Sequence, residues 1–521
     1  MIYRYKIKKG EVFFGGESSV FTDNTNYFDR NTFAKLNLNK RCSNQTMPLF
    51  VSTKGRYIWS DYPFKATFKN GNITIHGRDV KMYNAGSTLK EAYLAAMNAH
   101  FPSDKRELPD IFFRTAQYNT WMEYTYDPTQ EGVLKYAHDI VDNGFEPGIL
   151  IIDEGWHGRY GIWEFDFHKF PEPKKMIDEL HSLGFKVMLW IVPMVCPDGR
   201  EFLLNTATYI RGAYKDADKK FIRTKTGEVA LFKWWNGISA MLDMTKEWDV
   251  EFLDSQLKYL MEEYGVDGFK FDGGNVDMYI NEAIVNGEPP KGHDPHALSI
   301  AWNEFGRKYE FHEYKDTYLG GGKNCIQRLQ DRQHRWDKGG INTLIPSSII
   351  QGLIGYPFIC PDMIGGGAWS YNIMPGFKVD EELFVRMAQV SALCPMMQFS
   401  WAPWRALSEK NLNIVRDCMN LHKRFSDKIV ALVKESEISG EPILRNLEYN
   451  DPGKGYEYIM DQFMLGTDIL VAPVVTPNTY KRDVVFPAGE WVDADGNVYE
   501  GNKTYNLDAP IEKLLWFERK K

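Results

Sequence analysis

Acidic and aromatic residues recur where apolar, strand-like segments of this chain end. Asp272 ends the segment 266–272 (VDGFKFD), and Gly273 and Gly274 follow it. Similar segments contain or end in a further set of residues that could contact a ligand: Trp121, Asp153, Glu154, Trp156, Trp190, Lys270, Glu313, Lys315, Arg328, Asp331, Asp362, Gln398 and Trp401. Two carboxyl groups in a tryptophan-lined pocket can cleave a glycosidic bond, because one attacks the sugar or activates water while the other protonates the leaving oxygen.

Sequence signals of other chemistries are missing. No His or Cys cluster has metal-ligand spacing, no HExxH or GxSxG motif occurs, and no glycine-rich phosphate-binding loop precedes a helix. We therefore expect no bound metal and no cofactor. The expected ligand is a small-molecule or oligosaccharide substrate.

Each candidate residue also has an ordinary structural explanation. Asp272 could cap the turn that the two glycines make, and Asp331 could simply pair with Arg332. Trp190 lies inside the apolar run VMLWIVP and could belong to the core. The residue types alone leave these alternatives open.

Composition favours a sugar as the ligand. The 521 residues carry a formal charge of -8 with no long run of either sign, so no basic stripe points to a nucleic-acid partner. Aromatic residues make up 14% of the chain, with 15 Trp and 28 Tyr. Aromatic rings can stack on sugar rings, although a large barrel packed with aromatic residues would use them too.

The spacing of the cysteines and the first residues of the chain favour a location in the cytoplasm. The six cysteines show no CxxC or zinc spacing, which is typical of free thiols in a reducing environment. The start, MIYRYKIKKGEVFFGG, lacks the apolar core of a signal peptide, and no run approaches the length of a membrane span. We predict a cytoplasmic protein without a membrane partner; the sequence leaves homo-oligomerisation open.

Three regions follow from the hydrophobic rhythm. Residues 1–105 alternate in short stretches broken by turn signals, which predicts a β-sandwich. Residues 106–430 repeat strand, loop and amphipathic helix, whereas residues 431–521 return to alternation and predict a second β-sandwich. In the middle region, the segment 173–184 places Met176, Ile177, Leu180 and Leu183 on one helical stripe that ends at Gly184.

The middle region is predicted to be a (β/α)8 TIM barrel. The expected strand segments are 110–121, 147–156, 185–193, 267–274, 309–314, 325–331, 356–362 and 394–401. Eight strands over about 300 residues fit a closed barrel better than an open sheet, and no GxGxxG follows the first strand. A barrel of this kind gathers the carboxyl ends of its strands, where the polar residues lie, into one active site.

Five segments, in order, resemble glycoside hydrolase family 31. They are the early barrel run 151–195, the segments DGFKFDGG and YPFICPDMIGGG, the run QFMLGTDILVAPVV with FPAGEWVD near the end, and a fainter match at GEVFFGGESS near the start. The resemblance implies an α/β barrel enzyme flanked by two β domains.

Carried over by position, the resemblance makes Asp272 the catalytic nucleophile and Asp331 the acid/base. Asp331 ends its strand segment, and Trp336 follows five residues later as in the family pattern; Asp337 is the less favoured alternative. The resemblance further implies substrate contacts from a set of residues around them: Asp153, Trp156, Trp190, Trp235, Lys270, Lys315, Arg328, Asp362 and Trp401.

Departures from the family pattern indicate which branch of the family the sequence resembles. Leu329 and Gln330 replace the usual Trp-Gly before the acid/base, and the strand segment 394–401 ends in QFSW instead of Arg and His. The sequence most resembles the branch with the myogenesis-regulating glycosidase and bacterial α-galactosidases, in which a Trp upstream of the nucleophile, here Trp235, stacks on the sugar.

The resemblance therefore implies a retaining, exo-acting α-glycosidase, with α-galactosidase preferred. An α-glucosidase or α-xylosidase of the same family and a non-catalytic sugar-binding protein are the alternatives. We expect the two carboxyl groups roughly 5–6 Å apart, the pKa of Asp331 raised by burial and by the charge of Asp272, and the paired glycines to make room for a sugar ring close to the backbone.

Overall fold

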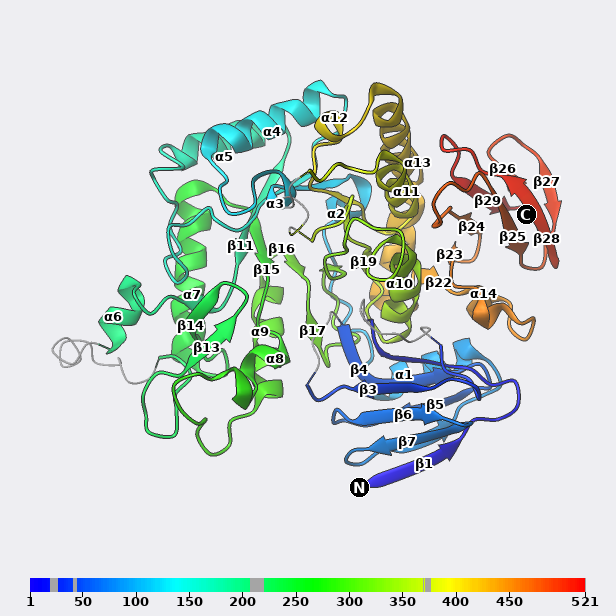
Figure 1. The fold of residues 1–521 in the computed structure, drawn as a ribbon, viewed down its shortest axis with the longest axis horizontal. Coiled ribbons are helices and arrows are strands. Elements are labelled where there is room, and N and C mark those ends of the chain that lie inside the picture. Colours follow the sequence, from blue (N-terminus) through cyan, green and yellow to red (C-terminus); the bar gives the residue numbers. More distant parts are fainter. Residues whose placement is uncertain (19–26, 41–44, 207–219, 369, 371–375, 521) are drawn as a thin grey trace.

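The computed structural model describes residues 1–18, 27–40, 45–206, 220–368, 370 and 376–520. In Figure 1 the N-terminal strands lie below a central barrel and the C-terminal sheets lie to its right. Five cysteines among these residues are free thiols, and Cys42 lies outside the described part of the chain.

The N-terminal region contains two antiparallel sheets with a common core. One has the strand order β1 (Ile2–Lys6), β7 (Asn72–His76), β6 (Lys65–Lys69), β3 (Ala34–Asn37). The other joins β2 (Phe13–Glu17), β4 (Gln45–Ser52), β5 (Arg56–Trp59) and β8 (Lys81–Asn84). Side chains from both sheets, among them Phe50 and Phe68, share one hydrophobic cluster. This two-layer arrangement follows from the alternation of apolar and polar residues along the strands.

Nine strands among the described residues form one parallel sheet at the centre of the molecule. In sheet order they are β19 (Ile359–Cys360), β18 (Gln327–Arg328), β16 (Phe311–Tyr314), β15 (Gly268–Phe271), β11 (Lys186–Ile191), β10 (Ile149–Ile152), β9 (Gln117–Asn119), β21 (Gln398–Phe399) and β20 (Met363–Ile364). Only Pro361 and Asp362 separate β19 from β20. The two ends of the sheet therefore meet at this segment, and each of the eight predicted strand segments contributes to the ring.

Helices follow most of the barrel strands. They include α4 (Gln130–Asp142), α5 (Pro173–Ser182), α7 (Glu247–Tyr259), α9 (Pro295–Phe305), α10 (Leu344–Leu353), α11 (Glu381–Ala392) and α13 (Glu409–Ser439). The predicted apolar stripe of α5 is buried at Met176, Ile177 and Leu180, and Gly184 has a φ of +98° just beyond the helix. None of the helices that the structure describes is long and apolar enough to cross a membrane.

One crossover departs from the expected alternation. Residues 315–326, all of which are described, form no helix between β16 and β18. Instead β17 (Thr317–Tyr318) pairs in parallel with β4 of the N-terminal region. The N-terminal sheet therefore holds the segment that begins with Lys315, a long-range contact that hydrophobic periodicity does not encode.

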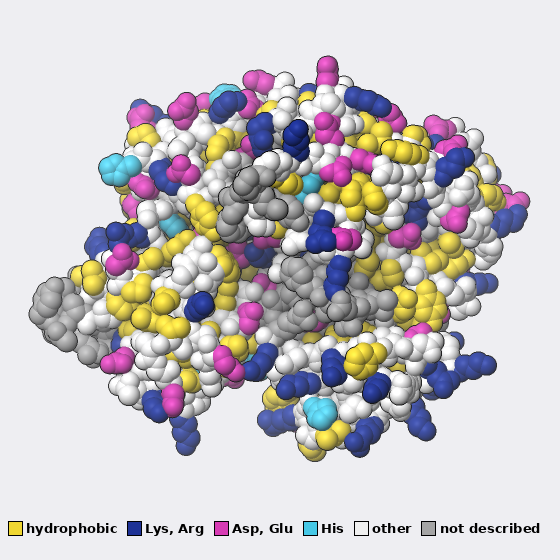
Figure 2. Space-filling view, in the orientation of Figure 1, with side chains coloured by type: hydrophobic (Ala, Val, Ile, Leu, Met, Phe, Trp, Pro, Cys, Tyr) yellow, Lys and Arg dark blue, Asp and Glu magenta, His cyan; other side chains and the backbone are white. Residues whose placement is uncertain are grey.

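A second departure is the excursion after β11. Here β12 (Met194–Val195), β14 (Gly237–Met241) and β13 (Leu231–Trp234) form a small antiparallel sheet. Figure 2 shows hydrophobic side chains gathered over this β13–β14 hairpin, which carries the exposed residues Trp235 and Ile238. The hairpin projects beyond the carboxyl end of the neighbouring barrel strand, β11.

The C-terminal region consists of antiparallel strands in two sheets. The larger has the order β22 (Leu444–Arg445), β23 (Phe463–Leu465), β24 (Ile469–Ala472), β29 (Leu515–Arg519), β26 (Glu490–Asp493), β27 (Val498–Glu500), and the smaller pairs β25 (Lys481–Phe486) with β28 (Lys503–Asp508). Both sheets contribute to one core. The boundary expected at residue 430 lies inside the continuous helix α13.

The two glycines after Asp272 have a packing role. Gly273 and Gly274 have φ angles of +63° and +69°, and a Cβ on Gly274 would lie 2.2 Å from Cδ1 of the buried Trp302. Neither glycine lines the cavity that the neighbouring carboxylates share. Gly274 therefore allows a left-handed turn against an indole and does not make room for a sugar ring. A Cβ on Gly273 would lie 3.5 Å from the ring of the cavity-lining Trp235, so the expectation stays a prediction for that glycine.

Replacing Gly274 by Ala should destabilise the protein by about 3 kcal/mol or more, because strain from the positive φ adds to a clash with Trp302. Gly292 is the matched control, since it has a φ of +90° but open space around its Cα. Gly292→Ala should cost about 1–2 kcal/mol, the strain alone. Denaturant unfolding of both variants measures the difference, and equal losses would contradict the packing role.

Candidate active site

A cavity of about 430 Å³ opens at the carboxyl ends of the barrel strands. Its walls come from the segments after β9, β10, β15, β16 and β18, from Trp190 in β11 and Lys270 in β15, and from the β13–β14 hairpin. The lining residues are Trp121, Tyr126, Asp153, Glu154, Trp190, Lys233, Trp234, Trp235, Lys270, Asp272, Asn275, Asp277, Met278, Lys315, Asp316, Gln330 and Asp331. Both predicted catalytic carboxylates thus share one cavity with five of the nine predicted substrate contacts.

Asp272 is held as an ionised carboxylate in the wall of this cavity. It directly follows β15, and its side chain accepts a hydrogen bond from Nε1 of Trp190 at 3.1 Å and from the backbone N–H of Gly273 at 2.8 Å. Nζ of Lys315 lies 3.2 Å from Oδ1. Burial opposes ionisation, but Lys315 and Lys270 with these two hydrogen bonds outweigh it and lower the pKa of Asp272.

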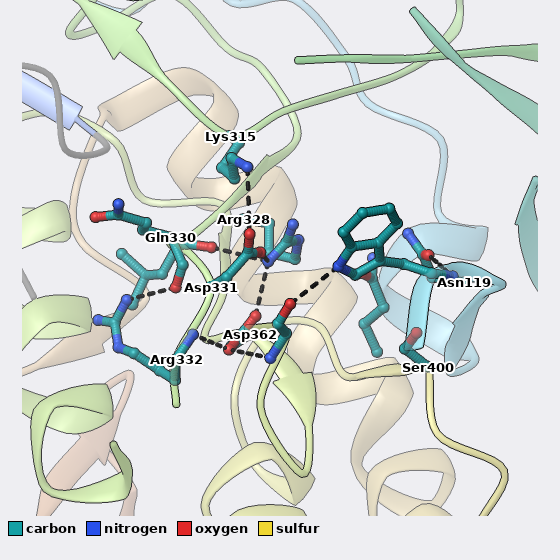
Figure 3. A network of polar contacts seen from close by, with 12 residues as sticks. Asn119, Lys315, Arg328, Gln330, Asp331, Arg332, Asp362 and Ser400 are labelled. Atoms are coloured by element: carbon teal, nitrogen blue, oxygen red, sulfur yellow. Dashed lines mark hydrogen bonds and ion pairs between the residues drawn. The ribbon is translucent and has the colours of Figure 1, made fainter. Parts of the chain in front are cut away.

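Asp331 lies beside Asp272, and the same lysine contacts both. Nζ of Lys315 is 3.4 Å from Oδ2 of Asp331, and Nη1 of Arg328 donates to Oδ1 at 2.9 Å (Figure 3). The two lysine contacts, 3.2 Å and 3.4 Å, place Oδ1 of Asp272 and Oδ2 of Asp331 at most 6.6 Å apart. This upper limit lies at the lower edge of the range of inverting glycosidases and allows the roughly 5–5.5 Å of retaining ones.

The expected rise in the pKa of Asp331 does not occur in the free site. Burial does disfavour the charged form, and the nearby Asp272 adds to this effect. Lys315, Arg328 and Lys270 outweigh both and lower the pKa of Asp331. The sequence indicated the carboxylate neighbour, but not that two cations would contact Asp331 directly.

Asp337, the alternative acid/base, lies outside the cavity. Its side chain is 64% exposed and pairs with Arg335 two residues earlier. The lining of the cavity includes Asp331 and omits Asp337.

Asp153 and Lys270 form a buried ion pair in the cavity wall. Nζ of Lys270 lies 2.6 Å from Oδ2 of Asp153, and both side chains are almost inaccessible to water. Nδ2 of Asn119 donates to the same oxygen at 2.7 Å. Because β10 and β15 flank β11, this pair crosses one strand of the barrel and fixes the direction of both side chains.

Arg328 and Asp362 lie behind the cavity instead of lining it. Nη1 of Arg328 donates to Oδ1 of Asp362 at 2.7 Å, and Oδ2 of Asp362 accepts from the backbone N–H groups of Arg332 at 2.6 Å and Gly367 at 3.2 Å (Figure 3). Both side chains are fully buried. Burial and the charge of Asp331 raise the pKa of Asp362 to about 6 despite Arg328. Arg328 and Asp362 therefore do not contact ring hydroxyl groups as expected from the sequence. Instead, these two side chains position Asp331.

The predicted tryptophans divide into two pairs. Trp190 and Trp235 line the cavity; Trp235 is 47% exposed at the tip of the hairpin. Trp156 is fully buried and donates from Nε1 to the backbone carbonyl of Trp190 at 2.9 Å. Trp401 is also buried and stacks on His334 with ring centroids 5.2 Å apart. Direct substrate contacts expected of Trp156 and Trp401 are not supported, because core packing encloses both rings.

Several wall residues were not given a role from the sequence. Trp121 and Glu154 were named only as strand-end residues. Tyr126, Asn275, Asp316 and Gln330 lie in loops, and Asp277 lies in the short helix α8 (Val276–Tyr279); none of these has a recognisable sequence pattern. Only their nearness to a strand end could have indicated them. No group of three or more His, Cys, Asp or Glu side chains within the described ranges could hold a metal ion.

Comparisons with known proteins agree with this architecture. Residues 108–431 match the glycosyl hydrolases family 31 TIM-barrel domain, and residues 440–520 match the glycosyl hydrolase family 31 C-terminal domain. The chain is 31% identical to the myogenesis-regulating glycosidase of Mus musculus over 82% of its length and 27% identical to alpha-glucosidase 2 of Bacillus thermoamyloliquefaciens over 76%. It spans 59% and 51% of these proteins, respectively.

A solved structure shares the whole fold. All of the chain superposes on 79% of a GH31 alpha-xylosidase from a soil metagenome complexed with xylose, with a TM-score of 0.81 and 20% identity. The family models cover the barrel and the region that follows it. This chain therefore belongs to glycoside hydrolase family 31.

Proposed function

We propose that the protein is a retaining, exo-acting α-glycosidase that removes terminal galactose by double displacement. The observation that carries this proposal is the short separation of Asp272 and Asp331, at most 6.6 Å between the oxygens that share Lys315. A separation within that limit is compatible with the roughly 5–5.5 Å between the carboxyl groups of retaining enzymes.

In the first step, a carboxylate oxygen of Asp272 attacks the anomeric carbon while the bond to the leaving oxygen breaks. Protonated Asp331 gives its proton to that oxygen, and a covalent glycosyl-enzyme forms. In the second step, water attacks the anomeric carbon, its proton goes to Asp331, and Asp272 leaves as a carboxylate. The hydrogen bond from Trp190 and the backbone N–H of Gly273 hold Asp272 in position for both steps.

Lys315 suits the charge changes of this cycle. The free site has a lysine between two carboxylates, and the low pKa of Asp272 keeps the nucleophile ionised. A sugar hydroxyl group that accepts a hydrogen bond from Lys315 would weaken the contact between Lys315 and Asp331. Asp331 would then be protonated more easily. Trp235 and Asp153, which both line the cavity, would contact the sugar ring and its hydroxyl groups.

The choice of galactose follows from the resemblance to the branch with bacterial α-galactosidases. An α-glucosidase or α-xylosidase is the second candidate, because one relative is named alpha-glucosidase 2 and a matching structure is an alpha-xylosidase. Hydrolysis of the 4-nitrophenyl α-galactoside, α-glucoside and α-xyloside by the purified protein decides between them. The galactoside should react fastest; faster turnover of either other substrate would overturn the galactose assignment.

Replacing Asp272 by Asn should lower turnover by roughly 10⁴-fold or more, because the amide cannot form the glycosyl-enzyme. Galactose binding, measured by calorimetry, should persist. Asp337→Asn is the matched control and should keep full activity, since Asp337 lies on the surface. Normal turnover in Asp272→Asn would exclude Asp272 as the nucleophile.

Replacing Lys315 by Met should move both limbs of the pH profile of kcat/KM to higher pH by about one unit or more. Loss of the cation favours the neutral forms of Asp272 and Asp331, so both pKa values rise. Lys323→Met is the control, because Lys323 pairs with Glu304 at the surface. A lower rate with an unshifted profile would show that Lys315 does not set these pKa values.

A further inference from the structure

Glu154 is a buried carboxyl group in the cavity wall that the proposed mechanism does not use. It directly follows Asp153 after β10 and is only 3% exposed. Its Oε1 accepts hydrogen bonds from Oη of Tyr160 and Nδ2 of Asn236. Nδ2 of Asn236 also lies 2.8 Å from Oη of Tyr160, and Oδ1 of Asn236 accepts from Oη of Tyr126 at 3.0 Å. Three loops thus fix the direction of this carboxyl group.

The second oxygen of Glu154 is left for a ligand. Within the described part of the chain, Oε2 has no hydrogen-bond partner. Protein atoms do not fully enclose Oε2, so this oxygen reaches open space. Because Glu154 lines the cavity, that space is the cavity itself.

The barrel places Glu154 opposite the acid/base. With β19 and β20 taken as one interrupted strand, the ring order is β9, β10, β11, β15, β16, β18, β19/β20 and β21. In this ring of eight, β10 and β18 are diametrically opposed. Consider a sugar bound with its anomeric carbon at Asp272 and its leaving oxygen at Asp331, which follows β18. The far side of its ring then points toward Glu154. In a pyranose, the ring carbon opposite C1 is C4.

We propose that Glu154 is a specificity-determining residue that donates a hydrogen bond from Oε2 to the 4-hydroxyl group of the bound sugar. The proposal rests on the proposed function, since it takes Asp272 and Asp331 as the catalytic pair. Galactose and glucose differ only in the direction of this hydroxyl group. A carboxyl group held by Tyr160 and Asn236 cannot follow the hydroxyl from one direction to the other without breaking those bonds.

The charges around Glu154 favour the neutral, donating form. Burial has the largest effect, and the charges of Asp153 and Asp272 add to it. The hydrogen bond from Tyr160 and the charge of Lys270 act in the opposite direction, and the pKa of Glu154 is raised to about 8. The titratable and charged groups facing it are Asp153 beside it after β10, Tyr126 and Tyr160 on loops, Lys270 on β15 and Asp272 directly after β15. At neutral pH, Oε2 therefore carries a proton.

A substrate pair tests this role without interference from the catalytic groups. The ratio of kcat/KM for the 4-nitrophenyl α-galactoside to that for its 4-deoxy analogue measures the 4-hydroxyl contact alone, because the ionisation of Asp272 and Asp331 affects both substrates equally. In the wild-type protein the ratio should be constant below about pH 7 and fall at least ten-fold as the pH rises through about 8.

Two variants assign the effect to Glu154. In Glu154→Gln, the amide oxygen can still accept from Tyr160 and Asn236 while the NH₂ group donates at every pH, so the ratio should stay high and flat. In Glu154→Leu the ratio should be low at every pH. Glu164→Gln is the matched control, because Glu164 accepts a 2.5 Å hydrogen bond from Tyr264 outside the cavity; it should behave as the wild type.

Two results would overturn the proposal: a ratio independent of pH in the wild-type protein, or a fall above pH 8 that persists in Glu154→Gln. The wild-type and Glu154→Gln measurements suffice if Glu154→Leu fails to fold. Failure of the galactose assignment is distinguishable, because galactose and glucose share one 4-deoxy analogue. If the glucoside is the better substrate, the same ratio is measured with the glucoside in the numerator.

Discussion

One ammonium group shared by two carboxylates is the interaction on which the candidate site depends. Without Lys315, Asp272 and Asp331 would be two like charges a few ångströms apart in the cavity wall, and the neutral form of each would be favoured. With it, both are ionised and their separation is limited. The backbone that carries Lys315 is held from outside the barrel: β17 pairs with β4, and Nε2 of Gln45 donates to the carbonyl of Lys315 at 3.1 Å. The N-terminal sheet thereby takes part in building the active site.

Charges of alternating sign continue outward from this lysine. Arg328 links Asp331 to Asp362, and Lys270 links the β15 strand to Asp153. Arg328, Asp362, Lys270 and Asp153 are buried, and removing one partner of a buried pair would leave the other uncompensated at a cost of about 3–5 kcal/mol. Burying these charges contributes little to the stability of the fold. The array does fix the directions of the side chains, which a two-carboxylate mechanism requires. The positions of Asp362 and Arg328 behind the cavity follow from this supporting role.

The sequence predicted the barrel strands well because each is a short apolar segment with a polar residue at its carboxyl end, and barrel geometry gathers such ends. Asp272, Asp331 and Lys270 could be found in this way. Trp156 and Trp401 could not be assigned correctly, since an indole after a strand looks the same whether it faces a cavity or the core. The direction in which the pKa of Asp331 shifts could not be predicted either, because it depends on which cations contact the carboxylate. The contact with Lys315 depends on pairing between residues about 270 positions apart. Glu154 drew no role because its partner Asn236 belongs to a hairpin far along the chain.

The central claim is that Asp272 becomes covalently bound to the sugar. A 5-fluoro-α-galactosyl fluoride should form the glycosyl-enzyme quickly and release it slowly, so that the intermediate accumulates. Mass spectrometry of the intact protein should show the added mass of one fluorogalactosyl group, and peptide mapping should locate it on Asp272. Turnover of the galactoside without any adduct, or an adduct on another residue, would contradict the account.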